Sequence, residues 1–145
     1  MSDLPFVDEH CVVVDLAATE LWARLLPRVE RSLSRGGGAR YARVVRTVPR
    51  GFGGARPLAL GSDFPGFRVV GVLPGRELAL EGRHLFSTYR LVFRIQELTD
   101  GRSRLRAETR ASFPGAAGWV YRLLVIRSGG HALAMRRMLD AYRRP

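Results

Sequence analysis

The sequence predicts an α+β domain in which a curved antiparallel sheet of about six or seven strands wraps a long C-terminal helix. Three observations predict it. Alternating strands separated by turn residues follow Phe67, a tight hairpin is centred on Thr99-Asp100-Gly101, and a helical period begins after Phe113-Pro114-Gly115. Because 145 residues are enough for one core, we expect residues 1–145 to form a single domain.

The N-terminal part of the chain predicts one strand and two short helices. His10–Asp15 has the composition of a strand, and an apolar helical period follows it. Pro27 should stop or bend this first helix, so a second short helix is expected from Arg28 to Ser34.

The middle of the chain is rich in glycine and proline. Tyr41–Val48 is strand-like, whereas Pro49–Gly66 is predicted to be mainly a loop with a short strand at Pro57–Leu60. Beyond it, Phe67–Leu73 and Arg76–His84 are predicted to be strands joined through Pro74-Gly75. In the second of these strands, alternation places four residues on the inner face: Leu78, Leu80, Gly82 and His84.

The hairpin around Thr99-Asp100-Gly101 predicts a register. With Gly101 in the left-handed conformation of a three-residue loop, residues whose numbers sum to about 200 face each other. The inner pairs are then Tyr89 with Ala111, Leu91 with Thr109, Phe93 with Ala107 and Ile95 with Leu105. The outer pairs are Arg90 with Arg110 and Arg94 with Arg106. Like charges directly opposite each other are unfavourable, so these arginines need compensation.

After Phe113-Pro114-Gly115 the period is that of one helix that runs to about Tyr142. Its broad apolar side, which includes Trp119, should lie in the concave face of the sheet. Gly129-Gly130 lowers helix propensity, so we expect a bend there or a close approach to a strand.

The most unusual feature of the composition is a net charge of +11. All 24 basic residues are arginines, and they are spread along the chain rather than gathered in a tail. The four outer arginines predict a compact positive patch whose repulsion is relieved by Glu108, by Glu77 and Glu81, or by a bound anion. We favour a solvated face over binding of nucleic acid.

The sequence also indicates where in the cell the protein is located and which cofactors or metals it could use. A single cysteine, Cys11, cannot form an internal disulfide, the start of the chain does not resemble a signal peptide, and no apolar run is long enough to span a membrane. A cytoplasmic location is expected. Since Gly51-Phe-Gly-Gly54 lacks the rest of a phosphate loop and no Cys/His cluster has metal spacing, we expect neither a cofactor nor a metal. The oligomeric state stays open.

The residues also carry a family resemblance. The segment Val14–Leu25, with Leu21 and Trp22 near its end, resembles the opening strand and helix of the START-like superfamily, also called SRPBCC. Phe113–Arg122 and Ser128–His131 are similar to bacterial members of its polyketide cyclase/dehydrase and lipid-transport group. The resemblance implies a helix-grip fold with a cavity between the sheet and the C-terminal helix. It does not imply a transferable catalytic motif.

Five residues on predicted inward faces are candidate ligand-binding residues: Arg127, His131, Tyr89, His84 and Trp119. An inward histidine or tyrosine is more often a hydrogen-bonded core residue, and an arginine in this position can extend to solvent along its stem. We expect the protein to bind a small lipophilic molecule, whose anionic group, if it has one, would meet Arg127. The alternatives are a cyclase/dehydrase-like enzyme that uses the same cavity, and a module that binds nucleic acid or a partner through the arginine-rich outer face.

Overall fold

The computed structural model describes residues 4–34, 47–49, 51–113, 115–122, 126 and 129–143. In chain order the elements are β1 (Phe6–Val14), α1 (Ala18–Ser34), β2 (Asp63–Phe64), β3 (Phe67–Leu73), β4 (Glu77–His84), β5 (Ser87–Glu97), β6 (Ser103–Ser112), α3 (Gly115–Arg122), α4 (Gly130–Asp140) and a 3₁₀ turn at Ala141–Arg143. Among these residues, no helix is both long enough and apolar enough to cross a membrane.

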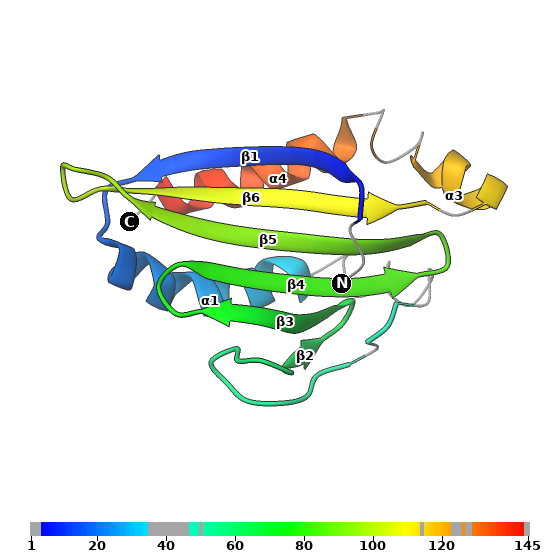
Figure 1. Ribbon diagram of the computed structural model, residues 1–145, viewed down its shortest axis with the longest axis horizontal. Coiled ribbons are helices and arrows are strands. Elements are labelled where there is room, and N and C mark those ends of the chain that lie inside the picture. The colour runs from blue at the N-terminus through cyan, green and yellow to red at the C-terminus, as the bar shows by residue number, and fades with distance from the viewer. Residues whose placement is uncertain are drawn as a thin grey trace.

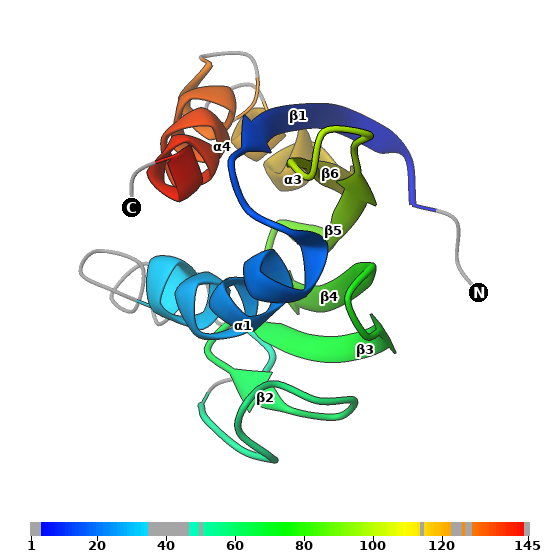
Figure 2. The ribbon, with the colours of Figure 1, turned by 90° about the vertical axis from the view of Figure 1, so that its left-hand side faces the viewer.

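The described strands form one antiparallel sheet in the order β1-β6-β5-β4-β3-β2 (Figure 1). Helices α1 and α4 lie on the same side of this sheet, α4 next to β1 and α1 near β4 and β3 (Figure 2). The α+β class, the curved sheet and the C-terminal helix are confirmed. The sheet has six strands, at the lower end of the predicted range.

The predicted hairpin register is confirmed pair by pair. Tyr89 faces Ala111, and each following pair down to Ile95 and Leu105 occurs as expected. Gly101 has a φ of 82°, the left-handed value that the three-residue loop requires. Because the inner pairs mostly join a large side chain to a small one, β5 and β6 leave room above their concave face.

The core fills the space between the concave face and the two helices. Helix α1 contributes Leu21, Leu25 and Val29, and α4 contributes Met135 and Leu139. They pack against buried side chains of the strands, including Val12, Leu78, Leu80, Phe93 and Leu105. Burial of each such side chain stabilises the fold by about 1.5–3 kcal/mol.

The two short helices predicted after the first strand are instead one helix. Helix α1 runs from Ala18 to Ser34 with Pro27 inside it. Proline removes one hydrogen bond and leaves the carbonyl of residue i−4 without its usual donor. Pro27 and Ala23 both lie on the exposed side of α1, where water can solvate that carbonyl. The free energy gained by packing the apolar side of α1 therefore outweighs the destabilisation that Pro27 causes.

The predicted continuous C-terminal helix is interrupted. Helix α3 ends at Arg122 and α4 begins at Gly130, preceded by Gly129 with a φ of 80°. A residue in the left-handed conformation cannot continue an α-helix, and glycine adopts it without a steric penalty. The glycine pair thus separates two helices, and α3 lies beyond the end of β6 (Figure 1).

The loop before β3 differs from the prediction in one respect. Pro57–Leu60 is not a strand, although Leu58 is buried in the core. Most of the strand expected at Tyr41–Val48 lies outside the described residues, and Val48 forms a single bridge with Arg83. The loop reaches the sheet at Gly66, whose backbone packs directly on Gly82 of β4.

Candidate functional site

A pocket of about 280 Å³ lies between the concave face of the sheet and the helices. Strands β3 to β6 form its floor, and α3, α4 and the last turns of α1 form its sides. It occupies the room left by the large-to-small pairing of β5 and β6, since Ala111 and Thr109 are both among its lining residues.

Aromatic rings line one side of the pocket. The ring of Tyr89 lies 5.4 Å from that of Phe67 in an edge-to-face arrangement and 5.6 Å from that of His84. Tyr121 of α3 lies edge-to-face on His84, with ring centroids 4.8 Å apart. Such rings offer both flat apolar surface and edges to an aromatic ligand.

The hydroxyl of Tyr89 is fixed by the loop before β3. It donates a hydrogen bond to the carbonyl oxygen of Gly66 at 2.5 Å. Gly66 in turn donates its N–H to the carbonyl oxygen of Pro49. Tyr89 therefore positions the loop that closes this side of the pocket.

The ring of His84 is held neutral. Its Nδ1 accepts a hydrogen bond from the N–H of Phe86 at 3.0 Å, which requires that Nδ1 carry no proton. Burial lowers the pKa of His84 below its ordinary value, because the charged imidazolium is poorly solvated there. At neutral pH His84 therefore acts as part of the aromatic wall.

The other side of the pocket is polar and is centred on His131 of α4. Its Nε2 lies 3.1 Å from the Thr109 hydroxyl and 3.3 Å from Oδ1 of Asp8. The second oxygen of Asp8 lies 3.2 Å from Nε2 of His10. Oδ1 of Asp8 is buried and has no well-aligned hydrogen bond within the described part of the chain, so its approach to His131 is a charge contact. One imidazole nitrogen thus faces both a hydroxyl and a carboxylate.

A β-bulge brings Asp8 into this cluster. The register of β1 on β6 shifts between Phe6 and Asp8, after which Asp8 and His10 share the concave face with Val12. Neither residue was among the predicted site residues: Asp8 lay outside the expected strand, which began at His10, and no inward face was assigned to that strand. The alternation of residues 8, 10, 12 and 14 was the signal that could have found them. None of the described His, Cys, Asp and Glu side chains form a group suited to a metal ion.

Three of the five predicted site residues come together in the pocket: His84, Tyr89 and His131. Arg127 lies outside the described residues. Trp119 does not line this pocket, because it lies on the outer side of α3, where the residue is 60% exposed. Residues 119 and 121 point about 200° apart on a helix, and in α3 it is Tyr121 that faces the pocket. The prediction for Trp119 assumed one continuous helix, which would have had a different orientation.

The predicted positive patch on the outer sheet face is neutralised. Arg90 binds Glu81, Arg94 binds Glu77 and Glu108, Arg106 binds Glu9, and Arg110 binds Glu108. Four arginines are thus matched by four glutamates, of which Glu9 was not foreseen. These ion pairs supply the compensation that the four facing arginines need.

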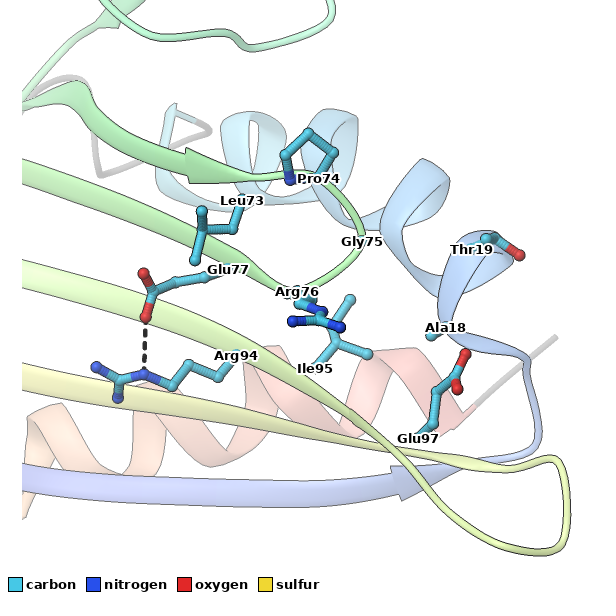
Figure 3. Close-up of a pocket in the computed structure, with 10 residues that line it drawn as sticks. All are labelled: Ala18, Thr19, Leu73, Pro74, Gly75, Arg76, Glu77, Arg94, Ile95 and Glu97. Atoms are coloured by element: carbon cyan, nitrogen blue, oxygen red, sulfur yellow. Dashed lines mark hydrogen bonds and ion pairs between the residues drawn. The ribbon is translucent and has the colours of Figure 1, made fainter.

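Another hollow, of about 520 Å³, lies at the opposite end of the sheet from α3. Figure 3 shows it between the β3–β4 turn and the start of α1, with Arg94 bound to Glu77. Leu73, Arg76 and Glu97 on its sides are exposed, so the hollow is open to solvent. It lacks the aromatic wall and the buried polar cluster of the 280 Å³ pocket.

No protein-family model and no curated protein matches the sequence. Solved structures do match the fold. CalU16 from Micromonospora echinospora is 15% identical, with a TM-score of 0.54 over 94% of this chain and 75% of its own. Norcoclaurine synthase from Thalictrum flavum, in complex with dopamine and hydroxybenzaldehyde, is 12% identical, with a TM-score of 0.53 over 92% and 83%. A Thermobifida fusca protein is 15% identical, with a TM-score of 0.55 over 92% and 91%. At 12–15% identity these likenesses show the fold alone, and they agree with the helix-grip arrangement of an antiparallel sheet and a C-terminal helix described above.

Proposed function

We propose that the protein binds a small lipophilic molecule in the 280 Å³ pocket. The observation that carries this proposal is the pairing of an aromatic wall with one polar cluster in a recess between sheet and helices. This combination is typical of small-molecule sites, which usually enclose about 300–1,000 Å³. A pocket of about 280 Å³, just below that range, favours a compact ligand. The norcoclaurine synthase complex, with its two small aromatic compounds, supports the same interpretation.

The polar cluster suggests which group the ligand carries. Thr109 and His131 line the pocket, and each can donate or accept a hydrogen bond. A hydroxyl group, above all a phenol, can also do both and therefore satisfies either partner. Asp8 does not line the pocket and acts through its contact with His131. An anionic group would be repelled by Asp8 and would depend on Arg127, which remains a candidate from the sequence alone.

Filling the pocket should abolish binding. We expect phenolic and fatty amphiphiles to raise the melting temperature of the parent protein in a concentration-dependent way. Ala111→Leu places a larger side chain into the lining and should remove this shift while the protein stays folded. Thr88→Leu, on the outward phase of the same region of β5, is the matched control and should retain the shift. Binding that survives in Ala111→Leu would contradict the proposal.

A second candidate function is a cyclase/dehydrase-like enzyme that uses the same pocket. The observation that favours it is the contact of His131 with both Asp8 and Thr109. A histidine beside a carboxylate can accept a proton from an acidic C–H or hydroxyl of the ligand and return it to a leaving hydroxyl, with no redox partner.

A measurement of turnover would distinguish an enzyme from a protein that only binds the ligand. If the protein is an enzyme, a bound compound should be converted to a product of different mass or retention time, and His131→Gln should slow conversion by about 10²–10⁴-fold while binding persists. Asp8→Asn should lower the rate without changing the fold. If the ligands are recovered unchanged after long incubation, the enzyme hypothesis is rejected and binding remains the proposed function.

A further inference from the structure

Helix α3 exposes large apolar side chains at one end of the molecule. Trp119 is 60% exposed and Val120 is 49% exposed, and Phe6 at the start of β1 is 56% exposed. Phe6 and Trp119 border one shallow hollow of about 170 Å³, together with Phe113 and Arg122. We call these five residues, Phe6, Phe113, Trp119, Val120 and Arg122, the α3 patch. Grouped exposed apolar side chains of this size mark an interaction surface.

Positive charge accompanies the α3 patch. The guanidinium of Arg122 lies 5.9 Å above the ring of Phe113, and that of Arg110 lies 5.9 Å from the ring of Phe6. Arg110 is already bound to Glu108, whereas Arg122 forms no ion pair with any described carboxylate. Arg122 is also exposed, so it can reach an anion outside the protein.

Helix α3 is held in place on the body of the protein. Gly118 packs so closely that a side chain there would meet the backbone of Phe113 and Phe86. Tyr121 packs its ring on His84 and Phe86. The exposed side of α3 therefore has a defined position beyond the end of β6 (Figure 1).

We propose that the α3 patch docks on an anionic lipid surface. Tryptophan is favoured at the boundary between lipid headgroups and acyl chains, and beside it Arg122, which forms no ion pair with a described carboxylate, matches the lipid phosphates. The net charge of +11 attracts the whole chain to an anionic surface. The same charge opposes association with a second copy through this patch, since two chains of +11 would repel each other.

Docking would bring the pocket to the membrane. Phe113 belongs to both the α3 patch and the pocket lining, and Tyr121 lines the pocket from the inner side of α3. A lipophilic ligand could then pass between membrane and pocket with little exposure to water. This inference goes beyond the proposed function, because docking does not require that the pocket be occupied.

Vesicle sedimentation tests the docking directly. The parent should sediment with vesicles of phosphatidylcholine and phosphatidylglycerol, less as salt rises, and should stay in solution with phosphatidylcholine alone. Arg122→Gln should weaken partitioning about fivefold, and Trp119→Ser about tenfold. Leu73→Ser and Arg76→Gln, also exposed but at the opposite end of the sheet, are matched controls and should partition like the parent.

Tryptophan fluorescence gives a second measurement. The chain has two tryptophans, so Trp22→Phe leaves Trp119 as the reporter, and its emission should shift to the blue on anionic vesicles. The proposal is overturned if the parent does not bind anionic vesicles at low salt, or if binding is equal in Trp119→Ser and the controls. It is also overturned if light scattering shows a dimer that Trp119→Ser dissociates. Vesicle binding without any ligand-induced thermal shift would support docking and reject the pocket proposal, so the two can fail separately.

Discussion

Replacing Gly82 with alanine is expected to lower the melting temperature by roughly 5–10 °C, as an overpacking penalty of about 1–3 kcal/mol implies for a chain of this length. A methyl group at residue 82 would overlap the carbonyl group of Gly66 and lie 2.8 Å from the Tyr89 hydroxyl. The first of these neighbours is backbone, so it cannot rotate away as a flexible side chain would. The Gly66 loop must move, and its hydrogen bond from Tyr89 must break.

The same substitution should also abolish ligand binding, because Gly66 and Tyr89 both line the pocket. Thermal denaturation and ligand-induced shifts measure the two effects on one sample. Gly51→Ala is the matched control, since no atom lies within 4 Å of a side chain there, and it should behave like the parent. If Gly82→Ala has the same melting temperature as the parent, the Gly66 loop does not pack on β4 as described.

Replacing Glu108 with glutamine should destabilise the protein by about 1–3 kcal/mol at neutral pH, as expected when a buried charged hydrogen-bonding partner is removed. The Glu108 side chain is 11% exposed and accepts hydrogen bonds from both Arg94 and Arg110. It separates the two arginine pairs that cross β5 and β6, so its loss leaves their repulsion partly uncompensated. Urea denaturation of parent and variant measures the difference.

The pH dependence gives an independent check. Burial acts to raise the pKa of Glu108, but the hydrogen bonds from Arg110 and Arg94 outweigh it and hold the pKa below its ordinary value. A lowered pKa in the folded state means that the stabilisation is fully present above the unfolded value of about 4.3 and is lost as pH falls through the folded value. The difference between parent and Glu108→Gln should therefore be constant near neutrality and shrink below about pH 4.3.

Glu20→Gln is the matched control for this experiment. Glu20 is more than half exposed and pairs with Arg24 one turn away on α1. Such pairs contribute only about 0.3–0.5 kcal/mol. An equal effect of the two substitutions would show that Glu108 has no special role between the arginine pairs.

The β5–β6 hairpin and the concave phase of β4 could be predicted because short-range rules decide them. A glycine in the left-handed conformation sets the loop, the loop sets the register, and alternation then assigns each face. For the same reason, alternation alone placed His84 and Tyr89 on the pocket side of their strands. The sequence also offered Glu77, Glu81 and Glu108 as partners of the outer arginines, with a bound anion as the alternative, and all three glutamates form such ion pairs.

The helices were predicted less well, because their ends and bends depend on packing. Pro27 was expected to stop α1, but the buried leucines on the opposite side keep the helix intact. Gly129-Gly130 indicated a bend or a close approach to a strand, but helical periodicity extended across the pair, so the sequence pattern did not show that α3 and α4 are separate helices. That break turned Trp119 outward and made it part of the α3 patch rather than of the pocket.

The sequence by itself determined the α+β class, the hairpin register and the inward positions of His84, Tyr89 and His131, since periodicity and turn chemistry act over a few neighbouring residues. Only the tertiary structure decided that Asp8 and His10 join His131 and Thr109 in one cluster. These residues come from β1, β6 and α4, and a bulge in β1 aligns them. Contacts between such distant segments depend on how strands and helices pack against each other, which no local pattern in the chain specifies.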